Sequence, residues 1–186
     1  MNSHADSLRP SVIKYCSVIG KDPLLVQGAG GNVSWKDEGT LWVKASGTWL
    51  VEATEKDIFV PVDLNDLQTA IKKGDFAVTP KVKGESLLRP SIETLLHALM
   101  THRVVVHLHA IGPLAHLVRN NSEFNEICGR FKAEYPWAIV NYRKPGKDLA
   151  KAVAGVLAAV VDTKILLLQN QWKTARVTES DHQCLA

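Results

Sequence analysis

The sequence lacks the features that mark several common classes of protein. Its three cysteines are scattered and form no CxxC pair, so a disulfide framework is not expected. It has no run of lysine and arginine, and its net charge of +3 is too small to indicate a nucleic-acid partner. No apolar stretch approaches the length of a membrane span, and the first twenty residues contain no continuous apolar segment. We therefore expect a soluble, cytoplasmic, globular protein with no membrane or nucleic-acid partner.

The length and composition indicate one domain. With 186 residues, of which 46% are hydrophobic and 22% charged, the chain can bury one core but is short for two. No internal repeat or linker divides it. Hydrophobic periodicity disappears after Leu168, and the residues that follow have no obvious packed partner. Residues 1–170 are therefore predicted to form the domain, and residues 171–186 an atypical C-terminal tail.

The order of the predicted elements favours an α/β fold. The early strands, Leu41–Ala45 and Ile58–Val62, pair as hairpins with a short strand after a glycine-rich loop, and Pro61 indicates an edge or a bulge. Later strands alternate with helices, which fits a mixed sheet with helices on its faces. Helices are predicted at residues 7–20, 63–73, 91–101, 123–133 and 148–161, and later strands at 104–109, 138–142 and 165–168.

Two histidines on one predicted strand are the strongest functional signal. The run from Val104 to His109 is apolar and rich in β-branched residues, as expected for a buried strand. Because side chains alternate along a strand, His107 and His109 share a face. Each imidazole in an apolar layer needs a polar partner, so the pair is either hydrogen-bonded within the core or bound to a metal. We favour the metal site.

A carboxylate lies upstream of this strand, on the predicted helix 91–101. Ser91 is the expected N-cap, which makes a helix-dipole role for Glu93 the simplest explanation of that residue alone. Glu93 and His97 are four residues apart and share a helix face, aimed at the strand that follows. We expect His97 to pack or to support a ligand and not to bind metal itself.

Two loops have the character of anion-binding turns. Gly28-Ala29-Gly30-Gly31-Asn32 precedes a strand and lacks the sixth-position glycine of a dinucleotide fingerprint, so neither a Rossmann nor a P-loop interpretation holds. Its backbone N–H groups and the Asn32 amide could hold an anion. Ser46-Gly47-Thr48, after a strand, is similar. Each loop alone is more readily explained as a tight turn.

Together these segments resemble the class II aldolase/adducin family, the fuculose-phosphate-aldolase-like proteins. The matching stretches occur in the family's order, over residues 10 to 170. They are Gly31-Asn32-Val33-Ser34, Leu41-Trp42-Val43-Lys44-Ala45-Ser46-Gly47, Pro90-Ser91-Ile92-Glu93 with His97, and His107-Leu108-His109.

The resemblance implies a fold and an activity. Members are three-layer α/β/α sandwiches around a mixed, largely antiparallel sheet, commonly homotetramers. Their enzymes use a divalent metal, usually zinc, to cleave or epimerise sugar phosphates through an enediolate. By motif, His107 and His109 correspond to metal ligands and Glu93 to the acid/base residue. The residues that correspond to the phosphate or substrate-anion cradle are Asn32, Ser46, Gly47 and Ser91.

The sequence departs from the family where a third histidine is expected. Family enzymes take it from an Asn-His-Gly turn after a late strand, but here Asn170 is followed by Gln171 and Trp172. Glutamine is a poor zinc ligand, so metal affinity is expected to fall. The expected function is a metal-dependent aldolase-type lyase for a small, phosphorylated sugar or hydroxy-carbonyl substrate, impaired at this ligand. The alternatives are a non-catalytic, adducin-like interaction module and a pentose-phosphate 4-epimerase.

Overall fold

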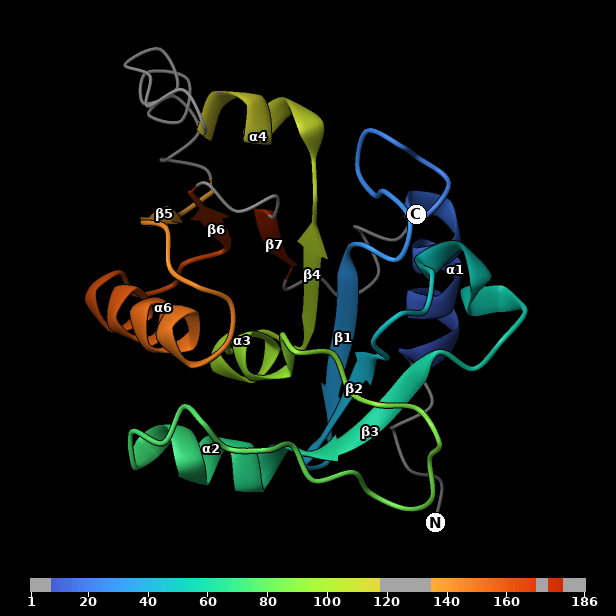
Figure 1. Cartoon of the computed structure of the whole chain (residues 1–186), viewed down its shortest axis with the longest axis horizontal. Helices are drawn as coiled ribbons and strands as arrows, with labels where there is room; N and C mark the ends of the chain where they lie inside the picture. Colours follow the sequence, from blue (N-terminus) through green and yellow to red (C-terminus); the bar gives the residue numbers. More distant parts are fainter. Residues whose placement is uncertain (1–7, 118–134, 170–173, 179–186) are drawn as a thin grey trace.

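The computed structural model describes residues 8–117, 135–169 and 174–178, which form a seven-stranded sheet (Figure 1). The strand order is β3-β2-β1-β4-β7-β6-β5, and only β5 and β6 are parallel to each other. The sheet is thus mixed and largely antiparallel, as predicted. The strands are β1 (Asn32–Asp37), β2 (Thr40–Lys44), β3 (Phe59–Asp63), β4 (Val104–Leu108), β5 (Trp137–Val140), β6 (Ile165–Leu168) and β7 (Thr174–Thr178).

Helices cover both faces of this sheet and make three layers (Figure 1). Side chains of α1 pack with apolar residues of β1, β3 and β4 on one face, and α4 packs there against β6. On the other face, α2, α3 and α6 pack over the remaining apolar side chains of the sheet. The helices are α1 (Arg9–Ile19), the 3-10 helix η2 (Leu50–Thr54), α2 (Leu64–Lys72), α3 (Thr94–Leu99), α4 (Ile111–Leu117) and α6 (Lys147–Ala159).

Strand β4 lies in the middle of the sheet and carries the first histidine of the predicted metal site. All five of its residues are buried. His107 pairs with Asn32 of β1 on one side and with Ala175 of β7 on the other. Directly paired residues project to the same face of a sheet, so Asn32 and His107 both face the layer that contains α3. The edge position predicted from Pro61 is confirmed, because β3 ends the strand order.

The helix that carries Glu93 starts later and ends earlier than predicted, so the assignment of Ser91 as its N-cap is wrong. Helix α3 begins at Thr94, and Glu93 occupies the N-cap position without a capping side-chain hydrogen bond. Ser91 instead organises the preceding turn: its Oγ accepts the Glu93 N–H at 3.2 Å, and its carbonyl accepts the Thr94 hydroxyl at 2.6 Å. This turn leaves the Glu93 carboxylate directed toward β4.

Three elements were not predicted, the first of which is the short 3-10 helix η2. The Ile-Gly-Pro turn after β4 begins helix α4, where Pro113 lies in the first turn and its missing N–H is tolerated. Thr174–Thr178, in the segment expected to have no packed partner, forms β7 between β4 and β6. The helix predicted at 123–133 lies outside the described residues. Within the described part of the chain, no helix is long and apolar enough to cross a membrane.

Candidate metal centre

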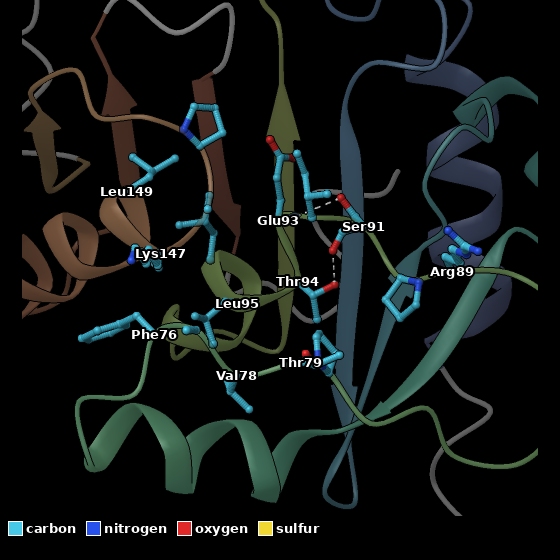
Figure 2. Close-up of a pocket in the computed structure, with 18 residues that line it drawn as sticks. Phe76, Val78, Thr79, Arg89, Ser91, Glu93, Thr94, Leu95, Lys147 and Leu149 are labelled. Atoms are coloured by element: carbon cyan, nitrogen blue, oxygen red, sulfur yellow. Dashed lines mark hydrogen bonds between the residues drawn. The ribbon is translucent and has the colours of Figure 1, made fainter.

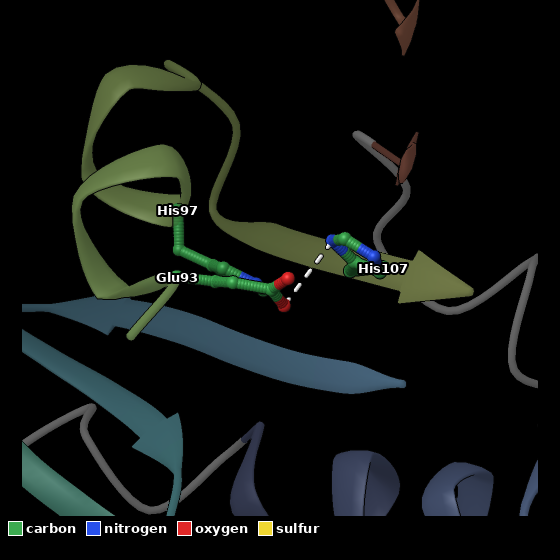
Figure 3. A group of neighbouring side chains, drawn as sticks. All are labelled: Glu93, His97 and His107. Carbon is green, nitrogen blue, oxygen red and sulfur yellow. Dashed lines mark ion pairs between the residues drawn. The ribbon is translucent and has the colours of Figure 1, made fainter. Parts of the chain in front are cut away.

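Three buried side chains converge between α3 and β4 (Figure 3). Ligand atoms of Glu93, His97 and His107 all lie within 4.8 Å of one another. Glu93 Oε2 and His107 Nδ1 are 3.4 Å apart. The backbone N–H of His97 donates to the Glu93 carbonyl at 3.2 Å, which fixes the two residues on one helix face. A carboxylate and two imidazoles are suitable donors for zinc or a similar divalent cation.

His109 lies beside this group but is not a member of it. Its ring centroid is 5.5 Å from that of His107, and the two rings meet edge to face. Strand β4 ends at Leu108, so His109 lies just beyond the strand end, in the short link to α4. Its backbone N–H donates to the Leu25 carbonyl at 3.0 Å, and its ring lies against Gly30. The structure thus places the two predicted ligands side by side, and it adds His97 to the group with Glu93.

The His97 ring is held by a partner on the neighbouring strand. Its Nδ1 lies 2.7 Å from the Ser34 hydroxyl of β1, and both residues are fully buried. Burial, together with a smaller effect of the nearby His107, lowers the pKa of His97 to about 3 against the opposing effect of Glu93. His97 is therefore a neutral imidazole at neutral pH, which is the form that binds metals.

The side-chain amide of Asn32 is buried next to the same group. The residue is 1% exposed, and neither its Nδ2 nor its Oδ1 has a hydrogen-bond partner within the part of the chain that the structure describes. An unpaired buried amide costs about 1–3 kcal/mol. Because Asn32 is the direct cross-strand partner of His107, a polar ligand bound beside His107 would be within reach of this amide.

The other predicted cradle residues come from two loops that lie side by side. An isolated bridge pairs Ala45 with Pro90, and the Ser46 N–H donates to the Arg89 carbonyl at 2.9 Å. Ser46 and Ser91 are therefore on adjacent segments. Gly47 has φ +79°, a conformation that L side chains rarely adopt, and a Cβ there would meet no atom within 4 Å. The backbone conformation requires this glycine, which leaves open space above the loop.

Lys44 joins these loops to the glycine-rich loop. It is 2% exposed, and its ammonium donates to the carbonyls of Thr48 at 2.6 Å, Ala29 at 3.2 Å and Ala45 at 3.4 Å. Burial lowers the pKa of Lys44 to about 8, while the negative charge of Glu93 opposes this shift. One cation thus holds both predicted anion-binding loops and lies in the electrostatic field of the Glu93 carboxylate.

Lys44→Met is expected to destabilise the protein by about 1–3 kcal/mol, because the carbonyls of Ala29 and Thr48 lose their donor. Methionine retains most of the apolar stem, so packing changes little. Urea unfolding measures the effect, with Lys21→Met on the exposed surface as the control. A loss no larger than that of the control would show that the ammonium does not hold the loops.

Gly30 is needed for space and not for its backbone angles. A Cβ at this position would lie 2.7 Å from His109 Nδ1 and 2.8 Å from the Gln27 carbonyl, both too close for real atoms. Gly30→Ala is therefore expected to displace the His109 ring or the loop, at a cost of about 1–3 kcal/mol. Gly112→Ala in α4, where a Cβ meets nothing within 4 Å, serves as the control. Equal urea midpoints for the two variants would contradict the packing of His109 on Gly30.

A cavity of about 490 Å³ opens beside the centre, between α3, α6 and the segment after α2 (Figure 2). Ser91 and Glu93 contribute to its wall, and Arg89 and Lys147 supply cationic side chains. Asn32, Ser46 and Gly47 are not among the residues that line it. Glu93 therefore lies between this cavity on one side and the two histidines on the other.

Some of these features had little signal in the sequence. The spacing of Glu93 and His97 predicts a shared face but does not show that ligand atoms of both residues come close to one of His107. Ser34 reads as an ordinary strand residue, and Lys44 reads as an ordinary charged one at a strand end. Alternation along β1 and β2 predicts which face of the sheet Ser34 and Lys44 occupy. The groups that their side chains contact are known only from the assembled structure.

Comparison with known proteins agrees with the fold. The sequence model of the Class II Aldolase and Adducin N-terminal domain matches residues 11–171. Over 171 residues, the chain is 28% identical to the uncharacterized oxidoreductase YuxG of Bacillus subtilis, covering 82% of this chain. It spans only 24% of the length of that relative.

Solved structures show the same architecture. The N-terminal class II aldolase domain of a conserved protein from Thermoplasma acidophilum has a TM-score of 0.75 and 25% identity, covering 97% of this chain and 88% of that one. The L-fuculose-1-phosphate aldolase of Thermus thermophilus has a TM-score of 0.59 and 17% identity, covering 93% and 82% respectively, and shows the fold alone.

The three-layer fold agrees with the architecture of the class II aldolase domain from Thermoplasma acidophilum. The chain belongs to the class II aldolase and adducin family. The predicted family and fold are thereby confirmed, and the group formed by Glu93, His97 and His107 could bind the divalent metal that such aldolases use.

Proposed function

We propose that this protein is a metal-dependent aldolase-type lyase that acts on a small, phosphorylated sugar or hydroxy-carbonyl compound. The observation that carries the proposal is the buried Glu93 carboxylate 3.4 Å from His107, at the wall of a cavity that a small molecule could enter. A carboxylate at that position can transfer a proton to or from a bound substrate. Membership of the class II aldolase and adducin family supports this class of reaction.

The donor set fits a zinc ion or another divalent metal. The site offers one carboxylate and two imidazoles, and His97 Nε2 is a buried atom without a hydrogen-bond partner among the described residues. His107 and His109 are the ligands that the family motif implies. When bound, the metal supplies a Lewis acid that stabilises the negative charge of an enediolate.

The chain's own residues would position the substrate and move its protons. Glu93 takes a proton from the substrate as the carbon–carbon bond breaks and returns one to the product carbon. Asn32 donates from its buried amide to a substrate oxygen. The loops of Ser46, Gly47 and Ser91 bind the distal phosphate and so hold the reacting carbons near Glu93.

The test is metal analysis of the purified chain together with a screen of sugar phosphates for aldol cleavage. About one tightly bound metal per chain and release of an aldehyde from at least one substrate are expected. Product analysis separates a lyase from a 4-epimerase, because the epimerase re-forms the bond that it breaks. Absence of both bound metal and turnover after purification in zinc would overturn the proposal.

A non-catalytic interaction module is the second candidate, since the matching family includes the adducin N-terminal domain. The observation that favours it is Gln171 where the family motif implies a histidine. A module of this kind is expected to bind no metal. We propose that the chain assembles as a homotetramer, and the module is expected to keep this assembly when Glu93 is replaced. Size measurement of Glu93→Gln alongside the metal analysis distinguishes the two.

A further inference from the structure

We propose that Lys36 is a positioning residue: its ammonium holds the end of α3 and thereby sets where Glu93 and His97 lie. It acts through this helix and the link that follows it, and not on the substrate. The inference rests on the proposed function only in taking Glu93 as the group that moves the proton.

The Lys36 side chain reaches from β1 to the link between α3 and β4. Its Nζ donates to the carbonyl of Met100, the residue that ends α3, and to the carbonyl of His102 at 2.8 Å. The backbone N–H of Lys36 donates to the Arg103 carbonyl at 2.8 Å, so main chain and side chain hold the same link. A cation at the C-terminal end of a helix also complements the helix dipole.

Helix α3 is so short that contacts with the rest of the protein must hold it. It has six residues, and an isolated helix of that length is unstable in water. Because side chains alternate along a strand, Ser34 and Lys36 of β1 face the same layer. The Ser34 hydroxyl lies 2.7 Å from His97 Nδ1, in the middle of α3, and Lys36 holds the end. Strand β1 therefore fixes the helix at two points, and with it Glu93 at the N-cap.

The environment of the ammonium ties its position to that of the link. Burial lowers the pKa of Lys36 to about 8, so the side chain is still mostly charged at neutral pH. Within the described part of the chain, Lys36 forms no ion pair with a carboxylate. A buried ammonium without such a partner is costly unless hydrogen bonds hold it. The two carbonyls of the link are the acceptors that meet this need.

Lys36→Met retains the apolar stem and removes the donor, and Lys83→Met is the matched control. The Lys83 ammonium donates to the Gly39 carbonyl and the Thr40 hydroxyl, both at 3.0 Å, at the start of β2. Each substitution thus removes two hydrogen bonds, but only Lys36→Met frees the end of α3. Circular dichroism checks that the variants fold.

The first readout is NMR of metal-free protein labelled with ¹⁵N-histidine, which follows the His97 ring without any turnover. Lys36→Met is expected to shift the His97 ring resonances and to weaken zinc binding by about 10-fold, the scale of losing support around a ligand group. Lys83→Met should leave both unchanged. Lys36→Arg keeps a charged donor at the same place and is expected to recover most of the loss.

The second readout is the division of the effect between kcat and KM in aldol cleavage. Lys36→Met is expected to lower kcat by about 10-fold or more, because a displaced acid–base group is a poor catalyst. KM should change by less than about threefold, since the loops proposed to bind the phosphate lie outside α3. Lys83→Met should alter neither constant.

His97 resonances, zinc affinity and kcat in folded Lys36→Met equal to those of Lys83→Met would overturn the role of Lys36. If Lys36→Met does not fold, Lys36→Gln, whose amide is too short to reach both carbonyls, takes its place with the same expected results and the same contradicting one. A shifted His97 spectrum with no cleavage of any sugar phosphate by the unaltered chain would support the role of Lys36 and reject the proposed lyase function.

Discussion

Glu93→Gln is expected to lower the rate of aldol cleavage by about 10²–10⁴-fold, the usual contribution of a general acid–base residue. Glu93 is buried, with 7% of its surface exposed. Glutamine has the same shape as glutamate, so it fits the same space. It cannot accept the substrate proton. The substitution is also expected to lower the affinity for zinc, because it removes a carboxylate ligand beside His107. Activity is therefore measured at saturating zinc.

The matched control is Glu85→Gln, which removes an exposed carboxylate from the loop before Glu93. Turnover of the control should equal that of the unaltered protein. Circular dichroism and urea unfolding should show both variants folded. Retained turnover in folded Glu93→Gln would remove Glu93 from its proposed role and would leave the acid–base group unidentified.

Gln171→His is expected to tighten zinc binding by about tenfold or more, which corresponds to about 1.4 kcal/mol or more. The family motif places a histidine ligand at this position, and an imidazole is a much better zinc ligand than a carboxamide. Position 171 lies outside the described residues, between β6 and β7, so the expectation rests on the sequence motif. Isothermal titration with zinc measures the change.

Gln169→His is the control for this gain, since it adds a histidine two residues earlier, directly after β6. It should leave zinc affinity unchanged. Equal affinities of Gln171→His and the unaltered chain would show that the ligand turn of the family does not carry over. A gain in both variants would show that any added imidazole near this end suffices.

Most of the sheet, and the approach of Glu93 to the strand of His107, could be predicted because they follow from local patterns. A β-branched run predicts β4, and the order of strands and helices predicts the mixed sheet. The ligand group could be predicted only in part. The directions of the His97 and His109 rings depend on Ser34 and Gly30, which are distant in sequence.

Two further features depend on long-range pairing. Strand β7 has only Ala175 and Val177 as alternating apolar positions, too short a pattern to predict a strand, yet it is paired on both sides. Lys44 is at a strand end, where a lysine is normally solvated, but the loops at Ala29 and Thr48 enclose its ammonium with carbonyls. The pairing of β7 and the burial of the Lys44 ammonium therefore could not be predicted from the sequence alone.

Solvent-deuterium exchange tests the central claim most directly, because it detects enediolate formation without knowledge of the full substrate. Dihydroxyacetone phosphate, a minimal phosphorylated hydroxy-ketone, is incubated with zinc-loaded protein in D₂O and followed by proton NMR. We predict protein-dependent loss of a hydroxymethyl proton signal, which chelation of the metal and Glu93→Gln both abolish. No exchange above the protein-free rate, with zinc bound to the chain, would contradict the assignment of this site as a metal-dependent aldolase centre.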